Sequence, residues 1–501
     1  MAEPVKRPTD EPLNRWDRWD RWKAPKYLKR GSGPDDLRLV AGSAVLGLVV
    51  AVGAVLAAGP WDSGQRKAER VRAAVQQRAG GAHHEGTAPG GPTPAPSAPA
   101  VLSALGTTVG LTAPAGASAL ETALEPLLDA PALGSVRTAV VVDAATGKQL
   151  YARGATTPMT PASTVKIATT AAALSALGPG HRIATKVTLS PDSRTLTLVG
   201  GGDPTLDKKA LRSLATGAAR SLRDGDGDGG TGPVRLTYDT SRYSGPPLHP
   251  IGPNENIAPV SALMVDEGRL DKSDRGPATR TDDPAGDAAR LFAGLLDEAG
   301  VDTRPAPSSG RAPDGARTVA RHLSEPLSEL VERALTNSDN DIAEALARQT
   351  ALKAGEPASF AGARRAVTAR LKALGLPLTG ARLADGSGLD RADKVTAGLL
   401  AELLALAAGP DHPELRPVLT GLPVAGFSGT LGDRYTAISP ATGLIRAKTG
   451  TLTGVNSLAG TAVDAQGRLL AFAFLASGST SPGEAEASLD ALATVLAEGT
   501  G

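Results

Sequence analysis

Ser163-Thr164-Val165-Lys166 is the first of three short strings from which the fold of this 501-residue chain can be inferred. Ser338-Asp339-Asn340 and Lys448-Thr449-Gly450 follow it in that order. Each string alone is weak evidence, because Ser, Lys and Gly are common residues. All three in order, each in a suitable local structure, indicate a site that transfers acyl groups without a histidine or a metal ion.

Ser163 is expected in the first turn of a helix. Thr160 suits the N-cap, Pro161 suits the first helical position, and an alanine-rich run at 167–177 follows. The Ser163 N–H would then be free to donate, and the helix dipole would favour negative charge beside it, as an oxyanion hole requires. Lys166 lies one turn further on the same face, where an amine whose pKa is lowered by burial or by a nearby cation can take the hydroxyl proton. A surface Ser and Lys on a capped helix would give the same local pattern.

The second string precedes another helical pattern at 342–352, so it can cap a helix as well as serve a site. In a site, Ser338 would relay a proton towards a leaving amine. Asn340 would hold both the Lys166 amine and a substrate amide, since its side chain carries donors and an acceptor. The cap and the catalytic role are compatible with each other.

The third string is predicted on a strand, where Gly450 removes a side chain at a point that a substrate backbone must approach closely. Lys448 would supply a second cation, which lowers the pKa of Lys166 and attracts an anionic substrate. Thr449 and Thr451 would offer hydroxyls to a carboxylate, and the Thr451 N–H would be the second oxyanion donor. A strand end with a turn-forming glycine is the structural alternative.

The composition of the chain excludes several other classes of protein. A net charge of +1 gives no reason to expect nucleic-acid binding. The absence of cysteine removes disulfides, thiol nucleophiles and Cys-ligated metals. The six histidines are scattered, without the i, i+4 spacing of a helical metal pair. We therefore expect neither a metal ion nor a cofactor.

An apolar, uncharged run at 39–59 is long enough to cross the ~30 Å core of a bilayer. A buried core helix fits less well because the run has no polar face, and the apolar region of a signal peptide is usually shorter, about 7–15 residues. We therefore predict an uncleaved signal anchor, with a cleaved signal and a secreted protein as the alternative. Ten Lys and Arg in residues 1–38 favour a cytoplasmic polar tail, which places the catalytic part and its substrate outside the cell membrane.

The rest of the chain divides by composition and periodicity. Residues 60–118, of which 79–118 are rich in Ala, Pro, Gly, Thr and Ser, are expected to form a linker. Five strand patterns predict one antiparallel sheet flanked by helices at 119–128 and 481–498, in an α+β or α/β fold. They lie at 137–142, 148–152, 444–452, 458–463 and 469–475.

The five predicted strands place the catalytic domain at 119–183 and 321–501. Residues 184–320 are expected to form one or two inserted β-rich domains. The strand-like patterns in this insertion lie at 185–199, 234–238 and 257–265.

Beyond the three strings, about 119–478 resembles the class C low-molecular-mass penicillin-binding proteins, the D-alanyl-D-alanine carboxypeptidases/endopeptidases of type 4. The supporting stretches are Gly200-Gly201-Gly202-Asp203-Pro204-Thr205-Leu206, Ala258-Pro259-Val260-Ser261-Ala262-Leu263, Asp385-Gly386-Ser387-Gly388-Leu389 and Leu422-Pro423-Val424-Ala425-Gly426. The resemblance implies a transpeptidase-like (β-lactamase-like) domain with domains inserted between the first and second strings. The Asp385 stretch matches a family string, but the sequence itself explains no role for it.

The resemblance also implies roles for the residues of the three strings. Ser163 would be the nucleophile, Lys166 the general base and Ser338 the proton relay, while Asn340 and Lys448 would give substrate and electrostatic support. Thr449, Gly450 and Thr451 would complete the substrate-binding edge. The expected activity is a serine D-alanyl-D-alanine carboxypeptidase, and also a D,D-endopeptidase, that acts on peptidoglycan stem peptides and is acylated by β-lactam antibiotics.

Two alternatives remain at this stage. A serine β-lactamase would need a base for the deacylating water, but no Glu-x-x-Leu-Asn string lies between Asn340 and Lys448. A catalytically silent peptidoglycan-binding scaffold would not need the intact Ser163, Lys166 and Ser338.

Overall fold

The computed structural model describes residues 117–225, 233–435 and 439–499. All of them belong to the second of two compact units of the chain, Thr108–Gly501. The predicted tail at 1–38, the predicted anchor at 39–59 and nearly all of the predicted linker lie outside these residues. Within the three ranges, no helix combines the length and the apolar character needed to cross a membrane.

Strands from both ends of this unit join in one antiparallel sheet. They are β1 (Val136–Asp143), β2 (Gln149–Arg153), β8 (Ile445–Leu452), β9 (Val455–Val463) and β10 (Leu469–Ser477). The order β2-β1-β10-β9-β8 pairs the first strand with the last, with Val140 opposite Ala473. The five-stranded antiparallel sheet and the fold class are as the sequence predicted.

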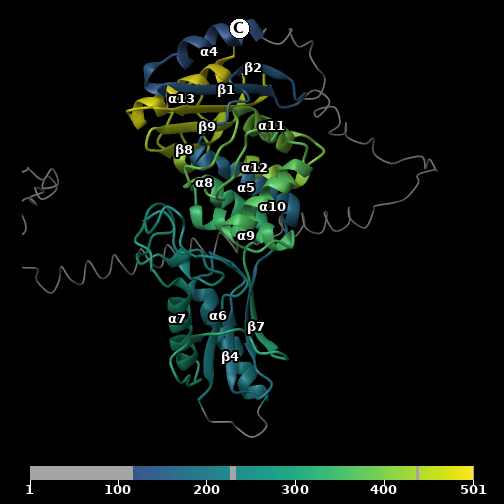
Figure 1. Ribbon diagram of the computed structural model, residues 1–501, viewed down its shortest axis with the longest axis vertical. Coiled ribbons are helices and arrows are strands. Elements are labelled where there is room, and N and C mark those ends of the chain that lie inside the picture. The colour runs from purple at the N-terminus through teal and green to yellow at the C-terminus, as the bar shows by residue number, and fades with distance from the viewer. Residues whose placement is uncertain (1–116, 226–232, 436–438, 500–501) are drawn as a thin grey trace, which may run out of the picture. The chain divides into compact units, whose positions relative to one another are not determined.

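The two faces of this sheet bury two separate cores, because successive side chains of a strand point to opposite faces. Val141 and Phe472 face the core shared with α4 (Ala117–Leu128) and α13 (Pro482–Glu498). Val140 and Ala473 face the core shared with the central helices, of which α11 packs directly on β1 and β10 (Figure 1). The central helices are α5 (Lys166–Leu177), α8 (Leu327–Thr336), α9 (Asn340–Lys353), α10 (Phe360–Ala373), α11 (Ala397–Ala408) and α12 (Arg416–Thr420).

Short 3-10 turns connect several of these elements. They are η1 (Pro131–Leu133), η2 (Ala162–Val165), η3 (Asp266–Gly268), η4 (Pro413–Leu415) and η5 (Gly429–Leu431). Both η2 and η5 contact β8, so they help to build the edge of the sheet on which the third string lies.

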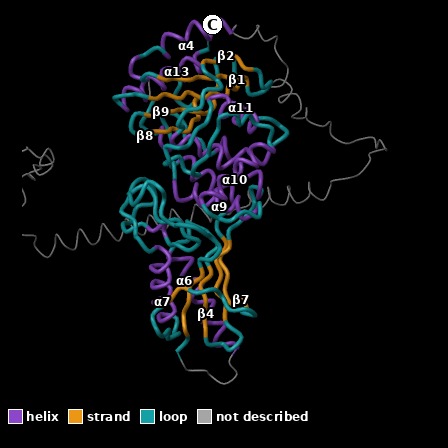
Figure 2. Tube along the Cα trace, viewed as in Figure 1, coloured by secondary structure: helices purple, strands orange, loops and turns teal. Residues whose placement is uncertain are grey.

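The insertion between the first and second strings forms a second five-stranded sheet. Its strands are β3 (Ala184–Leu189), β4 (Thr195–Val199), β5 (Arg235–Asp239), β6 (Ser308–Ser309) and β7 (Arg317–Leu323), in the order β6-β5-β4-β3-β7. β4, β5 and β6 pair in parallel, and α6 (Lys208–Gly225) supplies the crossover that the parallel pair β4–β5 requires. With α7 (Pro284–Glu298) also packed in its core, the insertion is an α/β domain (Figure 2).

Two sequence predictions about the insertion need correction. The predicted strand at 257–265 does not form; only an isolated bridge pairs Ile257 with Asn254. This apolar run belongs instead to the long connection between β5 and α7, much of which is loop (Figure 2). Leu263 is buried in the core of the insertion, and the Ala258 N–H donates to Asp341 of α9 at 3.0 Å. The second sheet also continues past 320, because β7 stays paired with β3 up to Leu323.

Candidate active site

The first string forms a 3-10 turn that leads into a buried helix. Ser163 lies in η2, and α5 begins at Lys166. Thr160, the predicted N-cap, does not cap the helix; its hydroxyl donates to the Arg391 carbonyl. Residues 166–174 are all buried, so this part of α5 lies in the core. The amine of Lys166 is therefore held away from solvent.

The Lys166 amine lies within hydrogen-bond distance of three oxygens. Its Nζ is 2.9 Å from Ser163 Oγ, 2.6 Å from Asn340 Oδ1 and 2.6 Å from the Ser387 carbonyl oxygen. The two carbonyl-type oxygens can only accept. A neutral amine, which has two N–H bonds, therefore spends both on Asn340 and Ser387. Its lone pair is then left facing the Ser163 hydroxyl, which is the geometry for proton transfer from Ser163 to Lys166.

The electrostatics of the pocket favour a Lys166 that can act as a base. Burial lowers the pKa of Lys166 to about 8, although the negative charges of Asp385 and Asp339 oppose this effect. Lys448 is also fully buried, and its Nζ donates to the Thr449 carbonyl at 2.8 Å. Burial, and then the charge of Lys166, lower the pKa of Lys448 well below its usual value. The two amines are thus electrostatically coupled, but burial is the main cause of the Lys166 shift.

Gly450 is required by the protein itself, not only by an approaching substrate. A Cβ atom on Gly450 would lie 2.2 Å from Ser457 Oγ, 2.6 Å from the Pro161 carbonyl oxygen and 3.1 Å from the Ser163 nitrogen. The Ser457 hydroxyl also donates to the Pro161 carbonyl at 2.6 Å, which ties η2 to the sheet. The Ser163 N–H makes no hydrogen bond to any residue that the structure describes. It is therefore free to donate to an oxyanion, as the sequence predicted.

Substituting Gly450 by alanine is expected to displace η2 and with it the nucleophile. Overpacking of this kind costs about 1–3 kcal/mol of folding free energy, and we expect slower acylation of Ser163 as well. Thermal unfolding and the rate of labelling by fluorescent penicillin measure the two effects. Gly294→Ala is the matched control, because a Cβ at that helical position meets no atom within 4 Å. Wild-type labelling and stability of Gly450→Ala would contradict this account.

The second string caps α9, as expected, but through Asp339. The Asp339 carboxylate accepts the Ile342 N–H at 3.0 Å, and Asn340 is the first helical residue. Ser338 lies half-buried on the turn between α8 and α9 with φ 57°, and within the described residues its hydroxyl has no hydrogen-bond partner. It is not bonded to Ser163 or Lys166, so its proton-relay role stays a prediction.

Thr449 of the third string and Thr451, the residue that follows the string, have different surroundings. The hydroxyl of Thr449 lies 2.8 Å from that of Thr430, which follows η5's first residue. The hydroxyl of Thr451 donates to Glu486 of α13 at 3.0 Å. Thr449 is the donor in this pair, so its contact with a carboxylate stays a prediction. The Thr451 hydroxyl is already used, and its predicted contribution is reduced to the backbone N–H.

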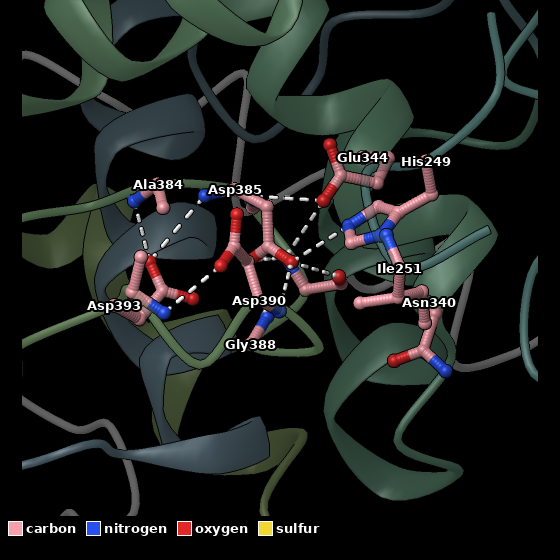
Figure 3. A network of polar contacts seen from close by, with 12 residues as sticks. His249, Ile251, Asn340, Glu344, Ala384, Asp385, Gly388, Asp390 and Asp393 are labelled. Atoms are coloured by element: carbon pink, nitrogen blue, oxygen red, sulfur yellow. Dashed lines mark hydrogen bonds and ion pairs between the residues drawn. The ribbon is translucent and has the colours of Figure 1, made fainter.

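The Asp385 stretch, whose role the sequence left unexplained, forms a loop that carries the third partner of Lys166. Asp385 accepts N–H groups from Ser387, Gly388 and Asp390 at 3.1, 2.6 and 2.8 Å (Figure 3). Glu344 of α9 accepts two more, from Gly386 and Ser387, at 2.8 and 3.0 Å. These bonds fix the loop that presents the Ser387 carbonyl to Lys166.

Burial by itself would raise the pKa of Asp385, but the hydrogen bond with His249, together with those from Asp393 and the Gly388 N–H, holds it below its usual range. Burial and then the Asp385 charge raise the pKa of Asp393, so the pair carries one charge rather than two. The Asp385 carboxylate is therefore ionised, and it is a stable acceptor for the loop N–H groups.

Two clusters of carboxylates are compact enough to be considered as cation sites. They are His249, Glu344 and Asp385, and Glu267, Asp339 and Asp341. In the first, backbone N–H groups, the imidazole and Arg348 already bind the carboxylate oxygens. In the second, arginines pair with the acids: Arg269 and Arg333 with Glu267, and Arg280 with Asp341. In both clusters, other groups of the protein already bind most of the carboxylate oxygens.

The sequence thus named Lys166 and two of its partners, Ser163 and Asn340, but missed most of the residues that position them. Asp385 and Ser387 lie in a stretch that was singled out without a role. Glu344 gave no signal, nor did Asn256, whose carbonyl accepts from Asn340 Nδ2 at 2.9 Å. His249 was one of six histidines without a pattern.

Comparisons with known proteins identify the family and the fold. The family described as D-Ala-D-Ala carboxypeptidase 3 (S13) matches residues 120–276 and 271–498. The chain is 39% identical over 422 residues to carboxypeptidase DacB of Mycolicibacterium smegmatis, which covers 81% of this chain and 89% of that protein. It is 30% identical over 459 residues to a D-alanyl-D-alanine carboxypeptidase of an Actinomadura species, with 75% and 84% covered. Penicillin binding protein 4 of Haemophilus influenzae shares the fold, with a TM-score of 0.63, 22% identity, and 76% and 99% of the two chains covered.

Proposed function

Because the chain belongs to the D-Ala-D-Ala carboxypeptidase 3 (S13) family, we propose that it removes the terminal D-alanine of peptidoglycan stem peptides through an acyl-enzyme on Ser163. The observation that carries this proposal is the hydrogen-bond arrangement of Lys166. Its two N–H groups are taken by Asn340 and Ser387, so its lone pair faces the Ser163 hydroxyl at 2.9 Å.

The acylation step follows from these positions. Ser163 Oγ attacks the carbonyl carbon of the D-Ala-D-Ala bond while Lys166 takes the hydroxyl proton. The Ser163 N–H, with that of Thr451, would stabilise the oxyanion that forms. Collapse of the tetrahedral intermediate breaks the C–N bond, and the departing amine receives, through Ser338, the proton that Lys166 took. Water then attacks the ester and gives a proton to Lys166. Lys166 passes this proton to Ser163 Oγ as the ester bond breaks, which returns Ser163 to its free form.

The substrate's terminal carboxylate would bind beside Lys448 and Thr449. Lys448 has a lowered pKa in its buried position, and a carboxylate beside it would favour its charged form. The Thr449 hydroxyl donates to Thr430 in the free protein, and it would have to turn its proton away from Thr430 to donate to the same group. Release of D-alanine from a D-Ala-D-Ala peptide tests carboxypeptidase activity, and cleavage of cross-linked peptide dimers tests the endopeptidase activity that we propose beside it.

We expect penicillin to acylate the protein and to remain attached. A class A β-lactamase uses a carboxylate base for the deacylating water. On α9, Glu344 has one oxygen bound by two loop N–H groups and the other paired with Arg348 at 2.9 Å, so it is not free to activate water. Asp341 is bound by the Ala258 N–H and Arg280. Fluorescent penicillin should therefore stay on the protein after the free reagent is removed. Loss of the label within minutes, with release of penicilloate, would instead indicate a β-lactamase.

We also propose that the catalytic part acts outside the cell membrane, tethered by residues 39–59. The length of this apolar run and the ten Lys and Arg of residues 1–38 support the proposal. N-terminal sequencing of the mature protein distinguishes this anchor from a cleaved signal and a secreted enzyme.

A further inference from the structure

The inserted domain supplies a partner for Asn340, one of the two carbonyl-type acceptors of Lys166. The Asn256 carbonyl, in the connection between β5 and α7, accepts from Asn340 Nδ2 at 2.9 Å. A carbonyl cannot donate, so the atom of Asn340 that faces Asn256 must be the NH₂ group. The other atom of the amide, Oδ1, is then the one that faces Lys166. The Asn256 carbonyl therefore prevents a flip of the Asn340 amide, which would turn its NH₂ group towards the N–H groups of Lys166.

The same connection also supplies a partner for Asp385. His249 is 2% exposed, and its Nε2 lies 2.8 Å from Asp385 Oδ2 (Figure 3). Its Nδ1 accepts the Ile251 N–H at 3.3 Å. Because a backbone N–H can only donate, Nδ1 carries no proton, and the ring proton is on Nε2. His249 is thus a neutral imidazole that donates to Asp385, with the ring of Phe360 edge-on at 5.2 Å.

Asp385 transmits this contact to the second acceptor of Lys166. Its Oδ1 accepts the Gly388 N–H at 2.6 Å. The Ser387 carbonyl and the Gly388 N–H belong to one planar peptide unit, so the bond to Asp385 sets the direction in which the carbonyl points. That carbonyl is the one that binds Lys166 Nζ at 2.6 Å.

We propose that residues 249–256 of the inserted domain position the general base, so that the Lys166 lone pair points at Ser163. His249 acts through Asp385 and the Ser387 peptide. The Asn256 carbonyl acts through Asn340. The inference rests on the proposed role of Lys166 as the base. It makes His249 a positioning residue, with no contact to substrate, and it gives the insertion a part in the chemistry.

Three substitutions of His249 separate its hydrogen bond from its volume. His249→Phe keeps a ring but removes the donor to Asp385. His249→Asn is polar but too short to reach Asp385, whereas His249→Gln carries an N–H at about the reach of Nε2. Tyr243→Phe is the matched control, because the Tyr243 hydroxyl joins the insertion to Gln349 of α9 at 3.3 Å without touching a partner of Lys166.

The first readout is the rate of acylation by fluorescent penicillin, divided by the fraction of the protein molecules that become labelled at the end of the reaction. The second is the kcat and KM for D-alanine release. We expect His249→Phe and His249→Asn to slow acylation and to lower kcat by roughly 10- to 100-fold, with KM within about twofold, as for other misaligned catalytic groups. His249→Gln should recover to within about threefold of the wild type, and Tyr243→Phe should match it.

Each remaining outcome decides against the inference. Wild-type acylation by His249→Phe and His249→Asn would overturn it. So would equal losses in all three variants, because the hydrogen bond would then be irrelevant. If His249→Phe does not fold, the comparison of Asn with Gln at this position still decides. Failure of the proposed function has a different signature: Ser163→Ala would still be labelled, whatever the His249 variants do.

Discussion

Ser163→Ala is expected to abolish D-alanine release and penicillin labelling together. The hydroxyl is the only group at this position that can form the ester, and its N–H and the rest of the pocket would remain. Removal of a nucleophile from a comparable serine hydrolase site costs on the order of 10⁶-fold in kcat, which would bring release to the background level. The two measurements are D-alanine released from a D-Ala-D-Ala peptide and fluorescence retained on the denatured protein.

The control for this substitution is another serine to alanine change that leaves the pocket untouched. Ser488 is suitable, because it is half-buried on α13, away from the pocket, and its hydroxyl only donates to the Glu484 carbonyl of its own helix. Ser488→Ala should release D-alanine at the wild-type rate. Equal release by Ser163→Ala and by the wild type would refute the assignment of the nucleophile, and mass mapping of the penicilloyl peptide would then locate the true one.

Lys166→Ala should lower the acylation rate by roughly 10³- to 10⁴-fold, the upper range for loss of a general base. The pH dependence is more specific. The amine is a base only when neutral, and burial lowers its pKa to about 8. Acylation by the wild type should therefore be slow below this pH, where Lys166 is an ammonium ion, and should increase as the pH rises through about 8. The increase should be absent from the residual activity of Lys166→Ala.

Stability must be measured beside this activity, because Lys166→Ala leaves the Asn340 and Ser387 oxygens without a donor. A buried acceptor that loses its partner costs about 1–3 kcal/mol. Rates should therefore be referred to folded protein from circular dichroism melts. Lys394→Ala is the control, since this half-buried lysine donates to Thr160 outside the pocket and should keep the wild-type pH profile. If acylation of Lys166→Ala showed the same increase as the pH rises through about 8, a group other than Lys166 would be responsible for it.

Much of the fold could be predicted because its signals are local. The β-branched run of β1, the polar turns between strands and the helix-starting residues act within a few positions of the chain. The prediction failed at Thr160 and at 257–265, where distant segments supply the partners: the Arg391 carbonyl for the hydroxyl of Thr160, and Asp341 of α9 for the Ala258 N–H. Neither partner is visible in the neighbouring sequence.

The sequence by itself determined which groups we propose to react: an alcohol and an amine three residues apart, an amide in the second string, and an amine and a glycine in the third. Their spacing and order suffice for this, because any helical turn places residues three positions apart on one face. Only the tertiary structure decided which way the Lys166 lone pair points. That direction depends on two carbonyl oxygens, at Asn340 and Ser387. Asn256 positions the first, and His249 positions the second through Asp385. Hydrogen bonds between segments so far apart in the chain form only when the protein has folded.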